Sequence, residues 1–169
     1  MIHRPLILTL TLDEECYSFF EGLRQKHFPP HLNFLSAHLT LFHHLPGDKV
    51  EEIAEHLDRV AASQAPMQLL VGEAKFMGKG VAFPVTGNEL LKLHKGLLQH
   101  WRAWLTPQDS QGLWPHVTVQ NKVSPDTARE LQTTLITSSH LPKSATGMGL
   151  KLWEYLGGPW EMRLEWNFS

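Results

Sequence analysis

The chain has 169 residues, of which 42% are hydrophobic and 19% charged, a length and composition typical of one globular domain with a real core. Its net charge of −2 excludes a general basic field for long nucleic acid, although a local basic groove is compatible with it. Cys16 is the only cysteine, which excludes an intramolecular disulfide and a multi-cysteine zinc site. We expect a single domain over residues 1–169, monomeric, without a membrane-spanning helix, in the reducing cytoplasm.

The first third of the chain alternates strands and helices. Residues 6–12 are apolar or alternating and predict a strand. Asp13 can cap a helix that should end before Pro29-Pro30. The stretch His38-Leu-Thr-Leu-Phe alternates polar and apolar side chains, which predicts a half-buried strand. Asp48 is the expected N-cap of a second helix, because apolar residues follow it at helical spacing.

The middle of the chain predicts a hairpin, a helix and a loop. Residues 67–76 and 81–86 are strand-like and are joined through a glycine-rich turn. Asn88 can cap a third helix, which has a broad apolar stripe. Residues 106–112 are polar, and we expect them to form an exposed loop.

The last third repeats the strand and helix pattern. His116-Val-Thr-Val-Gln alternates like the first histidine stretch, and Ser124-Pro125 should open a fourth helix. Residues 145–155 and 160–168 predict two closing strands around a glycine-proline turn. The last of them alternates apolar and polar side chains without interruption, which makes it the clearest strand in the sequence.

The two histidine stretches lie 78 residues apart, and the residues after each of them correspond. Thr40 matches Thr118, and a turn, an aspartate and an amphipathic helix follow at the same offsets. We infer two related lobes. The repeat predicts an α+β fold with a bilobal pseudo-two-fold arrangement, in which two antiparallel sheets line a central cleft and the helices lie outside.

Each motif places an imidazole and a hydroxyl two residues apart on one face of a strand. An imidazole can give or take a proton near neutral pH, so a facing pair suits in-line displacement at phosphorus. His38 and His116 would deprotonate the nucleophile and protonate the leaving oxygen, in an order that the nearly symmetric motifs leave open. Thr40 and Thr118 would donate to the non-bridging phosphate oxygens. This scheme requires no metal and no other cofactor.

At these residues the chain resembles the two-histidine phosphoesterase superfamily, in particular its branch of 2′-5′ RNA ligases and 2′,3′-cyclic phosphodiesterases. The resemblance covers most of the chain. It implies a cleft that holds both motifs, and hydrolysis of a cyclic phosphodiester, or the reverse ligation, on an RNA terminus or small nucleotide. One departure lies after the first motif, where the family often has an early glycine and this chain delays it to Gly47.

Further substrate contacts are expected from aromatic and basic side chains near the motifs. Trp114 and Tyr155 could stack a nucleobase, although a tryptophan in such strands is more often part of the core. Lys122, just past the second motif, could contact a phosphate, although most lysines of this kind are simply solvated.

Three other interpretations remain. Histidines around the first motif (His27, His31, His43 and His44) could form a metal site, but their spacing matches no established motif, so we expect exposed loop histidines. A non-catalytic nucleotide-binding or RNA-end-binding module would keep the cleft without turnover. A structural or partner-binding α+β protein would bind no anion in it.

Overall fold

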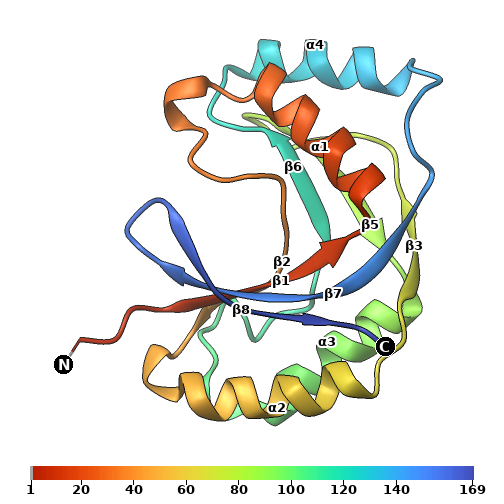
Figure 1. Cartoon of the computed structure of the whole chain (residues 1–169). Helices are drawn as coiled ribbons and strands as arrows, with labels where there is room; N and C mark the ends of the chain where they lie inside the picture. Colours follow the sequence, from red (N-terminus) through yellow and green to blue (C-terminus); the bar gives the residue numbers. More distant parts are fainter. Residues whose placement is uncertain (1) are drawn as a thin grey trace.

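The computed structural model describes residues 2–169, and its elements follow one another in two equivalent series (Figure 1). Each series runs strand, helix, strand, helix, strand, strand. The first contains β1 (Leu6–Leu12), α1 (Glu14–His27), β2 (Leu39–Leu45), α2 (Val50–Ala62), β3 (Met67–Val71) and β4 (Lys75–Phe76). The second contains β5 (Val81–Thr86), α3 (Asn88–His100), β6 (His116–Gln120), α4 (Pro125–Ile136), β7 (Ser144–Tyr155) and β8 (Trp160–Asn167).

The strands form one antiparallel sheet in the order β2-β1-β7-β3-β5-β4, with β6 on β5 and β8 on β7. The α+β class is therefore confirmed, and the two expected sheets are continuous. The long strand β7 joins them, because its first residues pair with β3 and its later residues with β8. Along its other edge β7 pairs with β1. The two strands that carry the motifs, β2 and β6, approach each other.

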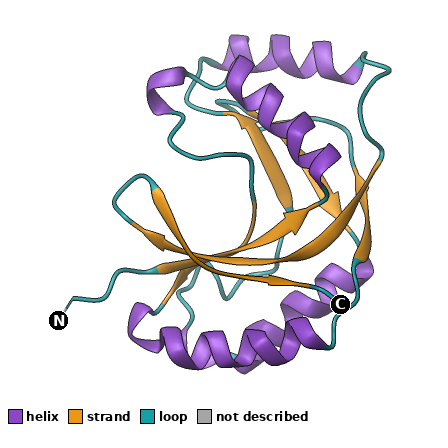
Figure 2. Cartoon of the chain, viewed as in Figure 1, coloured by secondary structure: helices purple, strands orange, loops and turns teal. Residues whose placement is uncertain are grey.

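The helices lie outside the sheet in two pairs, α1 with α4 and α2 with α3 (Figures 1 and 2). The first helix of each series packs on the other half of the sheet. Phe20 of α1 lies 5.4 Å from Phe83 of β5, measured between ring centroids. Reciprocally, Phe42 of β2 lies 4.8 Å from His94 and 5.3 Å from Trp101, at the end of α3. Each half thus completes its core with a helix from the other.

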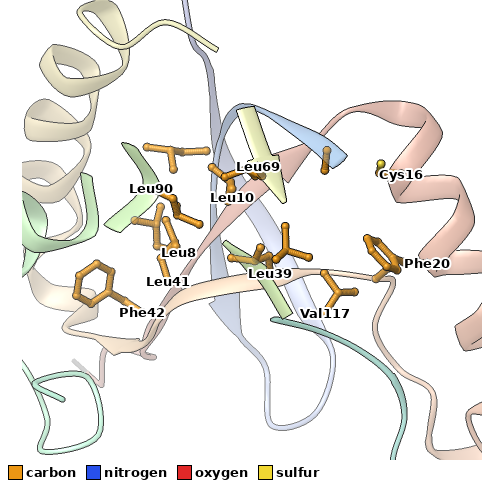
Figure 3. Packing of buried hydrophobic residues seen from close by; sticks show 14 of the residues in the cluster. Leu8, Leu10, Cys16, Phe20, Leu39, Leu41, Phe42, Leu69, Leu90 and Val117 are labelled. Atoms are coloured by element: carbon orange, nitrogen blue, oxygen red, sulfur yellow. The ribbon is translucent and has the colours of Figure 1, made fainter. Parts of the chain in front are cut away.

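One continuous apolar core results from this exchange. Figure 3 shows it from Phe42 on one side to Cys16 and Phe20 of α1 on the other. Leu39 and Val117, the residues that follow the two motif histidines, are completely buried in it. Burial on the opposite face of each motif strand is therefore what fixes the direction of the histidine and threonine side chains.

Two of the four expected helix starts are confirmed by a side-chain cap. Asp13 accepts from Cys16 N at 3.3 Å, and Ser124 accepts from Thr127 N at 3.2 Å. The prediction for Asp48 is wrong, because this residue lies in a 3₁₀ turn (Gly47–Lys49) and α2 begins after it without a side-chain cap. The prediction for Asn88 is also wrong, because Asn88 is the first residue of α3 and Gly87 is the N-cap. The Gly87 carbonyl accepts from Leu91 N at 3.1 Å.

The expected hairpin and closing strands are present, with two differences. The strand predicted over residues 67–76 is interrupted after Val71 and resumes at Lys75. The last strand forms as predicted, but its apolar side chains do not build a buried face: Met162 is 44% exposed and Leu164 40% exposed. Among the strands of residues 2–169, β8 pairs with β7 alone, so the outer edge of β8 is not covered by another strand. None of the helices in residues 2–169 is both long and apolar enough to cross a membrane.

Candidate active site

The two predicted histidines stand at the starts of the two neighbouring strands. His116 is the first residue of β6, as expected, whereas β2 begins at Leu39, one residue after His38. Both rings are partly exposed, while the residues next to them in sequence are buried. The fold therefore brings the start of each series' second strand to one region of the molecule.

The two rings are held in the same way. His38 Nδ1 lies 2.7 Å from the Ser36 carbonyl oxygen, and His116 Nδ1 lies 2.7 Å from the Trp114 carbonyl oxygen. A carbonyl oxygen can only accept a hydrogen bond, so Nδ1 of each ring carries the hydrogen and donates it. Each Nε2 is thereby left as the proton acceptor of the neutral ring. Two imidazoles oriented alike by the carbonyl two residues earlier are suited to acid–base chemistry.

Burial keeps both rings neutral in the free protein. The pKa of His38 is lowered from 6.5 to about 4: desolvation is the largest cause, the nearby charges of Arg24, His116 and His43 add to it, and the Ser36 hydrogen bond opposes it. Desolvation also lowers the pKa of His116, with a contribution from His43. An anion bound between the rings would favour their charged forms.

This arrangement predicts a protein that loses stability in mild acid. The His38 and His116 pKa values are lower in the folded than in the unfolded chain, so the unfolded chain binds more protons below pH 6.5. We expect the free energy of unfolding to fall by about 2 kcal/mol between pH 7.5 and pH 5. Urea unfolding at several pH values measures this, and a His38→Asn variant should show a shallower slope. A stability that is constant or rises over this range would contradict it.

Two tryptophans lie against the motif histidines. Trp114 stacks on His116, with ring centroids 4.2 Å apart and planes at 21°, so one face of its indole supports the histidine. Trp160, which the sequence placed only in a strand, lies 4.7 Å from the His38 ring. Tyr155 pairs with Trp160 across the β7–β8 hairpin and is 41% exposed. Lys122 is exposed in the turn after β6, with φ of 62°. Contacts of Trp114, Tyr155 and Lys122 with a substrate stay predictions.

A cavity of about 260 Å³ opens beside His38. Thr9 and Thr11 of β1, Tyr17 of α1, and Lys151 and Trp153 of β7 contribute to its lining. Register explains the grouping, because Thr9 lies opposite Thr40 on one side and Lys151 on the other. Residues opposite each other across strands share a face of the sheet. A smaller cavity of about 120 Å³ lies between His38, Trp153, Trp160 and Phe34.

Arg24 of α1 links the segments of the two motifs by hydrogen bonds. Its side chain is buried, and one guanidinium nitrogen donates to the Thr118 carbonyl oxygen at 3.0 Å. Its other nitrogens donate to Oδ1 of Asn33 at 3.2 and 2.9 Å. Asn33 belongs to the loop that leads to His38, so this one side chain joins the approach to the first motif to the strand of the second. Desolvation lowers the pKa of Arg24.

The sequence predicted an exposed loop over residues 106–112, but this loop is only partly exposed. Asp109 in it is buried and accepts from the backbone N–H groups of His43 and His44. It also accepts from Nδ1 of His43, which lies in β2 and not in a loop. A carboxylate that satisfies three donors can be buried among polar residues, which composition alone does not reveal. Among residues 2–169, no three His, Cys, Asp or Glu side chains are grouped so that they could hold a metal ion.

The fold and the paired, equally anchored histidines define the class of two-histidine phosphoesterases. A family model of the 2′-5′ RNA ligase superfamily matches residues 12–159. The chain belongs to that superfamily, which confirms the resemblance seen in the motifs.

Solved structures agree with this assignment. E. coli LigT complexed with 3′-AMP matches with a TM-score of 0.66 and 18% identity, over 99% of both chains. TT0787 of Thermus thermophilus matches with a TM-score of 0.66 and 16% identity, over 97% of both chains. E. coli LigT complexed with NADP⁺ matches with a TM-score of 0.63 and 17% identity, over 99% of both. At these identities the likeness shows the fold. No curated protein sequence matches the chain.

Proposed function

We propose that the chain is a metal-independent cyclic phosphodiesterase, active as a monomer in the cytoplasm. Its substrate would be a 2′,3′-cyclic phosphate, or a related cyclic phosphodiester, on an RNA end or a small nucleotide. The observation that carries this proposal is the matched anchoring of His38 and His116, each by one carbonyl oxygen at 2.7 Å. It leaves two equivalent Nε2 atoms, and acid–base catalysis at phosphorus needs two such groups.

In the proposed reaction one neutral imidazole takes a proton from water as the water oxygen attacks phosphorus. The bond from phosphorus to one ribose oxygen breaks, and the second imidazole, charged when the anionic substrate is bound, gives that oxygen a proton. The products are a phosphomonoester and a free hydroxyl, so one water is consumed and protons balance. Thr40 and Thr118 would donate to the non-bridging oxygens, where negative charge develops. The same displacement, with a ribose hydroxyl of a second RNA as nucleophile in place of water, would give ligation.

The cavity beside His38 supports a nucleotide as the substrate. Its volume of about 260 Å³ and its lining by Tyr17, Trp153 and Lys151 offer aromatic surface and a cation next to the proposed phosphate position. Aromatic side chains stack bases of any identity, and a lysine contacts phosphate as a point charge. E. coli LigT, whose fold the chain shares, has been solved with 3′-AMP and with ATP. The cavity supports small or short substrates.

The test is hydrolysis of the four nucleoside 2′,3′-cyclic monophosphates by the native protein in excess chelator. We expect turnover that chelation leaves unchanged, with a product that carries a single 2′- or 3′-phosphate. Binding of the nucleotides without turnover would refute the proposal in favour of a non-catalytic binding module. Turnover that chelation abolishes would refute its metal independence.

A further inference from the structure

The strand β2 places a third histidine, His43, on the face of the sheet that carries Thr40. Thr9 lies opposite Thr40, and the preceding residue of β1, Leu8, lies opposite Phe42, so β2 contains one extra residue at this point and a second one before Leu45, which lies opposite Leu6. Such a β-bulge reverses the alternation of side chains beyond it. Phe42 shares the core face with Leu8, and the next residue, His43, returns to the face of Thr40. Its side chain is 45% exposed.

Asp109 holds this histidine in place. The buried carboxylate accepts from His43 N at 2.8 and 3.0 Å, from His44 N at 2.8 Å, and from His43 Nδ1 at 3.2 Å. The two backbone bonds and the ring bond outweigh the cost of burying the carboxylate, and the Asp109 pKa is lowered. With Nδ1 turned to the carboxylate, the opposite ring nitrogen, Nε2, points away from it.

The His43 ring acts electrostatically on both motif histidines. Its charge contributes to the lowered pKa of His38 and of His116, which places it within electrostatic reach of each. Asp109 precedes His116 by seven residues on the segment that leads into β6. The Asp109–His43 contact therefore joins β2 to the approach of the second motif. The corresponding position in the second series, 78 residues on, is Asn121, so the two halves of the site differ here.

A simpler role for Asp109 is to satisfy two backbone N–H groups beside an irregular strand. That role needs no imidazole, because His43 N and His44 N would donate to the carboxylate whatever their side chains. It therefore leaves unexplained why a half-exposed ring is fixed by its Nδ1 on the face that carries Thr40. An imidazolium can donate from both nitrogens, so one ring can bridge the Asp109 carboxylate on one side and a phosphate on the other.

We propose that His43, oriented by Asp109, is a third phosphate-contacting residue, whose Nε2–H donates to an oxygen of a phosphomonoester dianion bound between the two motifs. The chemical class it selects is a nucleotide with a terminal monoester phosphate, such as the product of the hydrolysis proposed above. The inference rests on the proposed function in taking this face as a phosphate site, and its test requires no turnover.

Calorimetric titration with uridine 2′-monophosphate compares the native protein with His43→Gln and with His44→Gln, its matched neighbour. Both glutamines keep the backbone donors to Asp109. Loss of one charge-assisted hydrogen bond should weaken monoester binding by about tenfold or more in His43→Gln. We expect His44→Gln to bind within about twofold of the native protein, since an exposed side chain outside the contact contributes little. Equal affinity in the native protein and His43→Gln would overturn the inference.

Imidazole nitrogen chemical shifts give a second reading that needs no variant. On addition of the monoester to the native protein, the His43 Nε2 resonance should move and that of His44 should stay. A stationary His43 resonance, or no binding of the monoester at all, would overturn the inference. Absence of turnover on cyclic nucleotides with monoester binding that depends on His43 would refute the proposed function and leave the third contact standing.

Discussion

His116→Ala is expected to hydrolyse its cyclic phosphodiester about 10²–10⁴ times more slowly than the native protein, and His38→Ala to lose a similar factor, as is typical when a general acid or base is removed. Each ring is anchored through Nδ1 and offers only Nε2 to the substrate. The remaining histidine can then serve one step of the displacement and not both. The fall should appear in kcat, because proton transfer occurs in the transition state and the Thr40 and Thr118 contacts to the bound phosphate persist.

Initial rates across the nucleoside 2′,3′-cyclic phosphates, with kcat and KM measured separately, check this result. The native profile against pH should be bell-shaped, and each variant should lose one limb of it. His140→Ala is the control, because His140 is exposed in the segment between α4 and β7 and should leave the rate unchanged. Full activity in either motif variant would contradict the two-histidine mechanism.

Local pattern was enough to predict the first residues of each motif strand. In β6, Val117 and Val119 point to the core, so alternation gave the face of His116 and Thr118, but a register shift against β5 after Thr118 leaves Gln120 buried as well. In β2 the same reasoning works as far as Thr40 and then fails. The bulge after it is set by the register with β1, which a local pattern does not contain. Alternation would have placed His44, not His43, on the face of the site.

The residues that the sequence missed are joined to the site by contacts between distant segments. Asp109 lies 66 residues from His43, and Arg24 lies 94 residues from Thr118. Asp109 sits in a polar stretch that reads as a surface loop, and Arg24 near the end of a helix reads as a solvated cation. Lys151 reaches the cavity only because β7 pairs with β1. Such partners become visible once strand order and register are known.

Arg24→Met is expected to lower kcat by about 10- to 100-fold, the usual cost of loosening a positioning contact. The buried guanidinium holds the Thr118 carbonyl oxygen and Asn33 together, and methionine fills similar space without a donor. Removing the cation relieves a desolvation cost but leaves the carbonyl unsatisfied, so the free energy of unfolding should fall by only about 1–3 kcal/mol. The strand β6 and the loop before His38 would then be less well positioned relative to each other.

A titration separates this positioning effect from simple destabilisation. The charge of Arg24 lowers the pKa of His38, so in Arg24→Met the His38 resonances should titrate at higher pH than in the native protein. Arg24→Lys keeps the charge but lacks the planar fork that reaches both acceptors. It should restore the His38 titration without restoring kcat. Arg59→Met, on the exposed face of α2, should change neither. If Arg24→Lys recovers full activity, the charge matters and the bridge between the motifs does not.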